Sequence, residues 1–354
     1  MIGIDLFAGA GGLSLGAKLA GINVVAAIEQ EKNAAATYKR NHKSTIVINN
    51  DIHKVDASTL PQIHDDTLIV FGGPPCQGYS YSNKKTRTSD NPNNSLFVEF
   101  LRVVKECKPD WFLFENVEGF KQFQNGAVRE EVKRLFEQLG YRVDDAVLLA
   151  SRFGVPQNRH RYFMVGNNRG VDYIFPWGTD EKYTVEDAIS DLPALQNGEM
   201  TVSLPYKCHA NEVGKYARSM RKGSRTSKQN FVSKNQDYVI ERYKYIGQGQ
   251  NWRAIPDELM QNYANKNNCH SGIYRRLIAS KPSVVISNYR KNMLIHPYEN
   301  RGLSVREAAR LQSFPDNYIF EGSIQRIQQQ IGNAVPPLLA KAVFDQIVRA
   351  DNSI

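Results

Sequence analysis

A cysteine and a glutamate have the sequence surroundings best suited to chemistry. Cys76 lies in GGPPCQGYS (72–80), directly after the apolar run 67–71, which is rich in strand-forming residues. The two prolines fix φ on the N-terminal side of the cysteine, and the glycines allow another group to approach the backbone closely. We therefore expect the thiol to be presented at the end of a buried strand rather than packed in a core.

Glu115 ends a second strand-like run, in WFLFENVEGF (111–120). In an open sheet of parallel strands, the carboxyl ends of neighbouring strands meet at the edge where ligands bind. Each residue alone has an ordinary explanation, because lone cysteines are usually buried and strand-end glutamates are usually solvated. A thiol, a carboxyl group and a rigid proline shelf at one edge together favour catalysis.

Hydrophobic periodicity predicts the strands and helices that must position these residues. The first 170 residues alternate between short β-rich runs and helical patterns, which predicts an α/β fold, a parallel sheet with helices on both faces. The predicted strands are 2–7, 23–28, 45–48, 67–71, 111–115, 142–150 and 161–165. Predicted helices include 95–106, 304–314 with a capping box formed by Ser304 and Glu307, and one from Pro336-Pro337 to about Arg349. Residues from about 170 to 300 predict a second, loop-rich domain.

The first predicted strand opens into DLFAGAGGLSLG (5–16), a glycine-rich turn followed by a helix. Such turns can hold an adenosine-containing cofactor, although the spacing here is not GxGxxG and a turn without a ligand is the alternative. Glu29 ends the second strand, where a carboxylate can accept hydrogen bonds from both ribose hydroxyls, and Asp51 follows the third. Two carboxylates would repel a phosphate-rich ligand, so S-adenosylmethionine fits best.

A thiol, an acid and a methyl donor suit one reaction. C5 of cytosine is a poor nucleophile, but attack of a thiolate at C6 creates an enamine whose C5 can take a methyl group. The acid would hold a proton at ring nitrogen N3 and relieve the developing charge. Because such a base must leave the double helix to be reached, base flipping follows from the chemistry.

The net charge of +9 is concentrated in one segment. Residues 201–300 contain 17 lysines and arginines against 6 aspartates and glutamates, a net charge of +11, so the rest of the chain carries −2. A solvated basic face is the ordinary explanation of such a segment. The asymmetry over a hundred residues nevertheless favours a polyanionic partner, and nucleic acid is the obvious one.

Cysteine spacing and hydropathy indicate the compartment. The four cysteines form no CxxC pair, and the dipeptides Cys208-His209 and Cys269-His270 lack the usual ligand spacing, so we expect reduced thiols and no metal. The chain has no run of eighteen apolar residues and no basic region before its first apolar stretch. We therefore expect neither a membrane span nor a secretory signal, and a cytoplasmic location.

The sequence resembles the DNA (cytosine-5)-methyltransferases. Six motifs of that family occur in its order: DLFAGAGGLSLG, GGPPCQGYS, FENVEGF, QNRHRYFMVG, REAARLQSFPD and QIGNAVPP. The resemblance implies a Rossmann-like S-adenosylmethionine-dependent methyltransferase sheet with a smaller, loop-rich target-recognition domain. It implies that Cys76 is the nucleophile and Glu115 the acid, and that Arg159 and Arg161 of the QxRxR motif steady Glu115 or the cytosine carbonyl.

The resemblance also implies a cofactor site and a catalytic loop. The cofactor residues would be Phe7, Gly9, Gly11, Glu29, Asp51, Ile52, Pro74, Leu96 and Asn333. Phe7 would pack on the adenine with Ile52 on its other face, and Asn333 requires the last helix to return beside the first strand. By composition, 80–95 is only a polar surface loop. In the family it is mobile, with Ser82 filling the gap left by the flipped base and Lys84, Lys85 and Arg87 contacting phosphates.

The resemblance divides the chain into a catalytic and cofactor-binding domain, 1–170 plus 301–354, and a basic target-recognition domain, 171–300. In the latter we expect phosphate contacts to supply affinity and major-groove contacts to supply sequence choice. The basic run 215–234 and the loop 247–252 are candidates, although a structural role is expected for Trp252. Because the chain starts in the first strand, we expect a compact bacterial or phage enzyme. It would act as a monomer on double-stranded DNA, alone or paired with a cognate restriction endonuclease.

Three alternatives remain open. In an RNA methyltransferase of the same family, the tRNA-methylating branch carries a Cys-Phe-Thr motif, which is absent here. A protein that grips DNA without catalysis would not need Cys76, Glu115, Arg159 and Arg161 all intact. The glycine spacing does not fit a nucleotide-dependent oxidoreductase well, and that function would leave the basic region unexplained.

Overall fold

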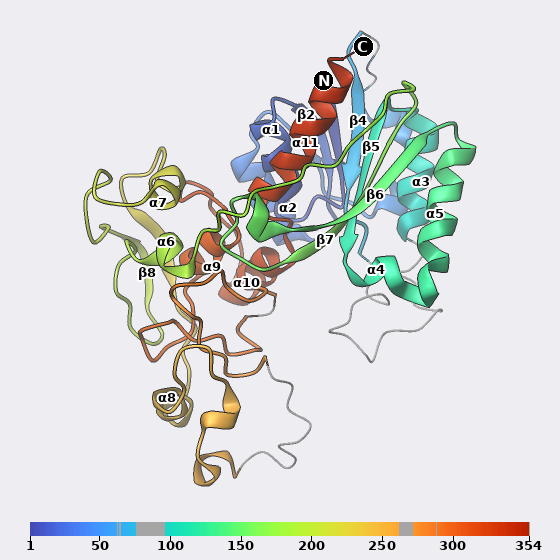
Figure 1. Cartoon of the computed structure of the whole chain (residues 1–354). Helices are drawn as coiled ribbons and strands as arrows, with labels where there is room; N and C mark the ends of the chain where they lie inside the picture. Colours follow the sequence, from blue (N-terminus) through green and yellow to red (C-terminus); the bar gives the residue numbers. More distant parts are fainter. Residues whose placement is uncertain (62, 64, 76–95, 262–271, 288, 354) are drawn as a thin grey trace. The chain divides into compact units, whose positions relative to one another are not determined.

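The computed structural model describes residues 1–61, 63, 65–75, 96–261, 272–287 and 289–353 (Figure 1). The chain forms two compact units. Unit 1 contains residues 1–153, 160–179 and 335–354, and unit 2 contains 154–159 and 180–334. This division differs from the expected boundary at residue 300, because the helices within 301–334 pack on elements of unit 2. The functional assignment of the two parts stays a prediction.

Unit 1 is built on a seven-stranded sheet of order β3-β2-β1-β4-β5-β7-β6. Its strands are β1 (Ile2–Leu6), β2 (Asn23–Ile28), β3 (Ile46–Ile48), β4 (Leu68–Gly72), β5 (Trp111–Val117), β6 (Arg142–Leu149) and β7 (His160–Asn167). All seven predicted strands are present, which confirms the α/β fold class. The expectation of a wholly parallel sheet was wrong for β7, which runs antiparallel to both β5 and β6. The short segment 150–159 between β6 and β7 contains no crossover helix, so the chain reverses direction there.

Helices cover both faces of this sheet (Figure 1). They are α1 (Gly12–Leu19), α2 (Lys32–Asn41), α3 (Leu96–Cys107), α4 (Gly119–Gln122), α5 (Ala127–Gln138) and α11 (Pro337–Asp351), with 3-10 turns η1 (Ile52–Lys54), η2 (Ala57–Thr59), η5 (Phe123–Gly126) and η6 (Ala150–Phe153). The last helix, α11, packs on α1 so tightly that a Cβ on Gly16 would lie 2.4 Å from the Cβ of Ala340. The two ends of the chain therefore belong to one packed layer.

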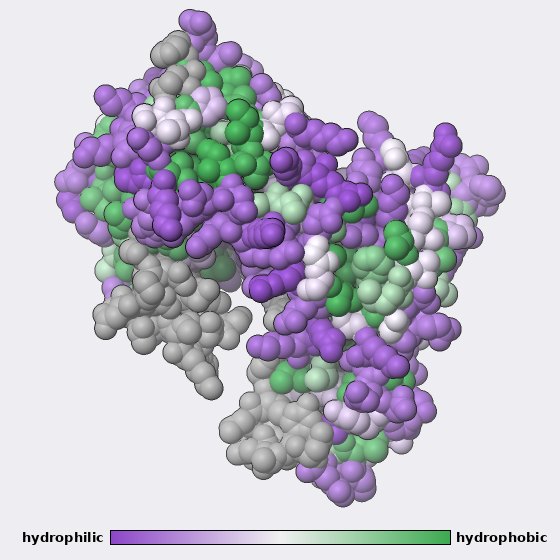
Figure 2. Space-filling model, turned by 180° about the vertical axis from the view of Figure 1, so that it is seen from behind, coloured by the Kyte–Doolittle hydropathy of each residue, from purple (hydrophilic) through white to green (hydrophobic). Residues whose placement is uncertain are grey.

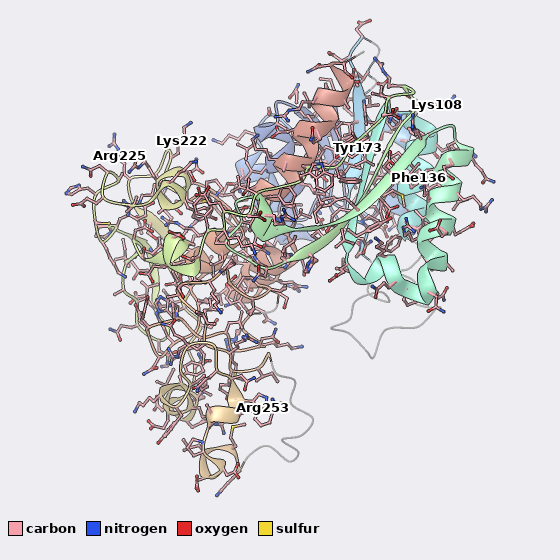
Figure 3. The ribbon with its side chains drawn as sticks, viewed as in Figure 1. Lys108, Phe136, Tyr173, Lys222, Arg225 and Arg253 are labelled. Atoms are coloured by element: carbon pink, nitrogen blue, oxygen red, sulfur yellow. The ribbon has the colours of Figure 1, made fainter. Side chains whose placement is uncertain are left out.

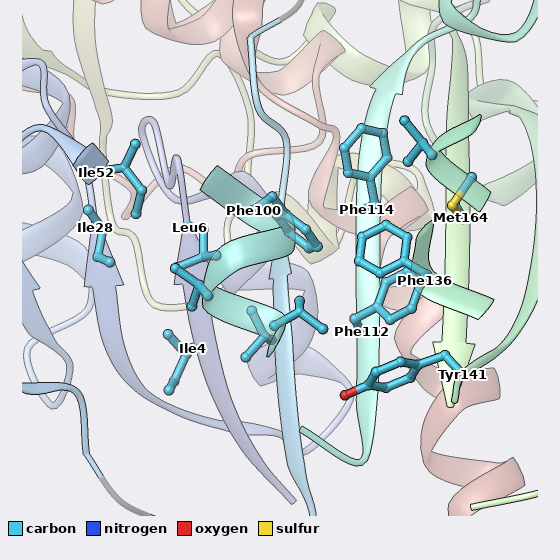
Figure 4. Close-up of a cluster of buried hydrophobic side chains, with 14 of the residues drawn as sticks. Ile4, Leu6, Ile28, Ile52, Phe100, Phe112, Phe114, Phe136, Tyr141 and Met164 are labelled. Carbon is cyan, nitrogen blue, oxygen red and sulfur yellow. The ribbon is translucent and has the colours of Figure 1, made fainter. Parts of the chain in front are cut away.

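A large core lies between the sheet and helices α3 and α5 (Figure 4). Aromatic side chains fill it, and the rings of Phe112 and Phe136 stack with centroids 4.0 Å apart. Phe100 meets Phe114 edge-on from α3, with centroids 5.5 Å apart. Aromatic pairs of this kind add about 0.5–1.5 kcal/mol each beyond simple burial. They hold β5 rigidly and so support the side chains at its carboxyl end.

Unit 2 combines short helices with a small antiparallel sheet. Its elements are α6 (Val185–Ile189), β8 (Met200–Leu204), α7 (Lys215–Met220), β9 (Ser227–Phe231), α8 (Asp237–Lys244), η7 (Trp252–Ala254), η8 (Asp257–Met260), α9 (Val305–Leu311) and α10 (Ile324–Asn333). The capping box predicted at Ser304 and Glu307 is confirmed at the start of α9. Arg310 of this helix is fully buried, and its guanidinium binds the carboxylates of Asp191 and Asp316.

A separate small core in unit 2 forms around Tyr243 and Tyr274. Arg276 lies beside it, 6% exposed, and its guanidinium donates to four backbone carbonyls and one side-chain amide, those of Tyr243, Ile246, His296, Glu299 and Asn300. Trp252 packs against this core, half-buried, as expected for a structural residue. The buried guanidinium of Arg276 therefore connects the segments of unit 2 around α8.

The surface is mainly hydrophilic, and apolar residues gather in separate patches on the face shown in Figure 2. Among the residues that the structure describes, no helix is both long enough and apolar enough to cross a membrane.

Candidate active site

Glu115 and Arg161 form an ion pair at the carboxyl end of β5. In the antiparallel register, Glu115 lies opposite Phe163 and Arg161 opposite Val117, so the two side chains lie diagonally on one face. The distance from Arg161 Nε to Glu115 Oε1 is 2.9 Å. Both residues are 8% exposed. The sequence motifs FENV and QNRHR thus contribute one partner each to a buried pair.

The environment of Glu115 suits an acid that must carry a proton. Burial raises the pKa of Glu115 to about 7, although the nearby charge of Arg161 opposes this rise. Burial also lowers the pKa of Arg161, while Glu115 acts in the opposite direction. At neutral pH the Glu115 carboxyl is therefore protonated in a large share of the molecules, unlike an exposed glutamate.

Gly73, directly before the two prolines, lies against Glu115. A Cβ built on Gly73 would lie 2.4 Å from Glu115 Oε2, so only glycine leaves room for the carboxyl group at this place. The amide of Asn116, the next residue of β5, donates to the carbonyl of Pro74 at 3.3 Å. Two neighbours in β5 therefore position Gly73 and Pro74. Cys76 follows two residues later and lies outside the described residues, as do Ser82, Lys84, Lys85 and Arg87.

The glycine-rich turn after β1 is tied to the end of β2. Phe7, Gly9 and Gly11 have φ values of 58°, 55° and 87°, and the value at Phe7 is unusual for a residue with a side chain. The carboxylate of Glu29 accepts hydrogen bonds from the backbone N–H of Gly9 at 2.7 Å and of Glu31 at 2.6 Å. Burial raises the pKa of Glu29, and these hydrogen bonds act against it. Glu29 thus orders the turn as well as ending its strand.

The other residues expected at a cofactor occupy several strand-end segments of unit 1. Asp51 lies at the surface and caps η1, and a hydrogen bond from the His53 side chain lowers its pKa. Ile52, the next residue, is buried, as is Pro74 after β4. Leu96 is half-buried at the first position of α3. Together with the turn after β1, these residues come from segments that follow three parallel strands and from the start of one helix.

Arg159 and Asn333 belong to unit 2. The sequence QNRHR taken alone would be interpreted as a solvated basic turn, yet Arg159 is only 2% exposed. Its guanidinium donates to the carbonyls of Ile286 at 3.0 Å and Gly332 at 2.7 Å. The partner of Glu115 is thus Arg161, while Arg159 joins distant segments of unit 2. Asn333 ends α10 and is exposed.

The basic segment 201–300 divides into internal and external cations. Arg221, Arg242 and Arg276 are buried, and each makes hydrogen bonds inside unit 2, for example from Arg221 to Asp191 at 2.6 Å. By contrast, Lys222 and Arg225 are exposed after α7 and point away from the ribbon, and Arg253 lies at η7 (Figure 3). Because several of these arginines are buried, fewer cations are accessible to a polyanion than the net charge of +11 suggests.

Sequence reasoning predicted that the glycines before Cys76 let another group approach the backbone, but it did not identify Glu115 as that group, and it missed Asn116. Gly73 matters because it makes room for Glu115, and Asn116 matters because it holds Pro74. The tripeptide Glu-Asn-Val was a signal for Asn116, but its partner lies 42 residues earlier in the chain.

The fold and site define a class of protein: an α/β enzyme with a Rossmann-like sheet, a glycine turn after its first strand and a buried acid at the carboxyl edge. A family model for C-5 cytosine-specific DNA methylases matches residues 1–349. Type II methyltransferase M.DdeI of Desulfomicrobium norvegicum is 36% identical, over 97% of this chain and 88% of that protein. Type II methyltransferase M1.HphI of Haemophilus parahaemolyticus is also 36% identical, over 99% of this chain and 87% of that protein.

Solved structures agree with this class. A prophage-encoded protein of E. coli, assigned as a DNA modification methyltransferase, superposes with a TM-score of 0.79 at 26% identity over 99% of both chains. The S. pombe Dnmt2 methyltransferase has a TM-score of 0.61 at 16% identity, over 99% of both chains, a likeness of fold alone. The chain therefore belongs to the C-5 cytosine-specific DNA methylases and is a DNA (cytosine-5)-methyltransferase.

Proposed function

We propose that the protein transfers a methyl group from S-adenosylmethionine to C5 of cytosine in a specific duplex DNA sequence, through a flipped base and a covalent adduct of Cys76 at C6. The observation that carries this proposal is Glu115. It is buried, its pKa is raised to about 7, and it lies against Gly73, three residues before Cys76. An acid that keeps its proton at neutral pH is what the cytosine ring requires.

The chemistry divides between the two residues. The thiolate of Cys76 adds to C6, and the electron pair displaced from the C5–C6 double bond moves into the ring toward N3. Glu115 donates its proton at N3, which neutralises this charge and leaves an enamine whose C5 is nucleophilic. S-adenosylmethionine, when bound, supplies the methyl group as an electrophile. After C5 is methylated, a base from solvent takes the C5 proton, the Cys76 thiolate leaves C6, and the N3 proton returns to Glu115, which restores the neutral aromatic ring.

The residues around the glycine turn fit a cofactor with adenosine and no pyrophosphate. Space is open at Gly9, where a built Cβ would meet no atom within 4 Å. Glu29 and Asp51 offer carboxylates suited to ribose hydroxyls, and Phe7 and Ile52 offer apolar surface for the adenine. Pro74 and Leu96 would complete the unit 1 contribution, with Gly11 shaping the turn and Asn333 contributing from unit 2.

DNA is the partner that the family and the basic segment support. Cytosine within a duplex hides C6 in the base stack, so the base must be flipped out before Cys76 can reach it. Ser82, Lys84, Lys85 and Arg87 would assist from the loop after Cys76, and unit 2 would read the sequence. The relatives are named Type II methyltransferases, which supports genetic pairing with a cognate restriction endonuclease. The enzyme would act in the cytoplasm as a monomer on DNA.

The experiment supplies S-adenosylmethionine labelled in its methyl group, with mixed-sequence duplex DNA and total tRNA as separate substrates. We expect label only in DNA, as 5-methylcytosine. The Cys76→Ala variant should lose methyl transfer and keep sequence-specific DNA binding. Label in tRNA alone would assign the protein to RNA, and label in neither would refute the proposal. Equal loss of binding and transfer in Cys76→Ala would make that thiol structural.

A further inference from the structure

A chain of buried polar groups lies beneath the glycine turn; Asp5 and Ser14 belong to the motif DLFAGAGGLSLG, whereas Tyr38 lies outside the six motifs. Asp5 on β1 and Ser14 in the first turn of α1 are both fully buried, and Ser14 Oγ donates to Asp5 Oδ2 at 2.6 Å. The hydroxyl of Tyr38 on α2 lies 2.5 Å from Ser14 Oγ. Either hydroxyl can be the donor in this contact, because burial raises the pKa of Asp5 to about 8 and a protonated Asp5 can itself donate to Ser14. The three side chains link β1, α1 and α2 across the start of the turn.

A second side chain from the end of α2 reaches the turn itself. His42, directly after α2, stacks on the Tyr38 ring with centroids 4.3 Å apart and hydrogen-bonds the backbone of Gly11. Burial, with a smaller contribution from Lys18, lowers the pKa of His42 to about 3, so the ring is neutral at physiological pH. A neutral imidazole provides one directional donor without adding a buried charge beneath the turn.

The turn between β1 and α1 is thus held from outside at three points. Glu29 accepts from the N–H of Gly9, His42 contacts Gly11, and Tyr38 binds the first turn of α1 through Ser14. Gly9 and Gly11 have few conformational preferences of their own, and Phe7 has a left-handed φ that its side chain disfavours. Outside contacts must therefore set its shape.

We propose that Tyr38 and His42 are positioning residues for the cofactor: from α2 they set the conformation of the glycine turn, and so control the affinity for S-adenosylmethionine without touching it. This inference rests on the proposed cofactor site. It assigns to α2, which carries no family motif, a part in cofactor binding through the Tyr38–Ser14–Asp5 chain and the contact from His42 to Gly11.

The test compares two tyrosine hydroxyls that make matched hydrogen bonds. Tyr38→Phe removes the hydroxyl that hydrogen-bonds Ser14. Tyr141→Phe is the control, because Tyr141 is also buried and its hydroxyl donates to the Pro109 carbonyl at 2.7 Å, before β5 and therefore at the opposite edge of the sheet. We expect Tyr38→Phe to raise the Kd for S-adenosylmethionine, measured by calorimetry without DNA, about five- to tenfold. The KM for the cofactor should rise equally, with kcat at saturation and the Kd for DNA unchanged. Tyr141→Phe should change none of these.

His42 provides an independent test. His42→Leu removes the contact with Gly11 and should weaken cofactor binding about fivefold or more, while His42→Gln keeps a neutral donor and should restore most of the affinity. Amide exchange at Gly9 and Gly11 should quicken in Tyr38→Phe and not in Tyr141→Phe. Wild-type cofactor affinity in both Tyr38→Phe and His42→Leu would overturn the inference. If wild-type protein itself bound no S-adenosylmethionine, the proposed function would fail instead, which distinguishes the two results.

Discussion

Replacing Gly73 by alanine should misplace the acid while leaving most of the fold intact. The new Cβ would lie 2.4 Å from Glu115 Oε2, whereas ordinary contact begins near 3.4 Å, so about 1 Å of movement is needed. Glu115 cannot retreat without disturbing its ion pair with Arg161, and overpacking of this size typically costs about 1–3 kcal/mol of stability. A misplacement of about 1 Å at a catalytic group can reduce the rate about 10²-fold.

The assay is single-turnover methyl transfer at saturating DNA and cofactor, together with urea unfolding. We expect kcat to fall about 10²-fold in Gly73→Ala and the Kd for DNA to stay within about twofold. Gly214→Ala is the control, because a Cβ there meets nothing within 4 Å and the φ of Gly214 is −61°. In a Glu115→Ala background, Gly73→Ala should no longer cost stability, since the clashing oxygen is gone. A folded Gly73→Ala protein with wild-type kcat would refute this reasoning.

Three further predictions follow from the buried charges. Because the pKa of Glu115 is raised to about 7 and its protonated form is the active one, kcat should fall about tenfold per pH unit well above pH 7, and a rate that still rises at pH 9 would contradict this role. The raised pKa also means that the stability contributed by the neutral carboxyl is lost as the pH rises from 4.5 toward 7. Arg276→Ala should leave several buried carbonyls unpaired in unit 2, so DNA binding should weaken at least tenfold while the Kd for S-adenosylmethionine stays within about twofold. The control is Lys244→Ala, which removes an exposed cation from α8 and should have little effect on the Kd for DNA or for S-adenosylmethionine. Equal DNA binding by Arg276→Ala and wild type would disprove the structural role of Arg276.

The sequence predicted the strands of unit 1 well, because most of them are apolar runs bounded by glycine, proline or polar residues. It did not predict the direction of β7, since alternation of side chains along a strand is the same in both directions. The burial of Arg159 was also beyond prediction. Its carbonyl partners, Ile286 and Gly332, lie 127 and 173 residues away in the chain, and a polar run such as QNRHR gives no sign of such neighbours.

Candidate site residues were predictable as types but not as contacts. Glu115 and the glycine turn were identified from their motifs, and the structure adds that Arg161 pairs with Glu115 and that Glu29 binds the N–H of Gly9. The sequence predicted that a glycine beside the prolines admits another group, but it could not identify that group. Only the position of the Glu115 carboxyl reveals why a side chain is excluded there.

The two units are interleaved along the chain, and this limits where a chimera between this enzyme and a relative can be joined. Unit 2 is not one continuous insertion, because residues 154–159 belong to it while β7 returns the chain to unit 1 before residue 180. A chimera that exchanged only 180–334 would pair the Arg159 of one parent with the carbonyls of another. An exchange of unit 2, to which we assign sequence recognition as a proposal, should therefore transfer 154–159 together with 180–334 and keep β7 of the recipient protein.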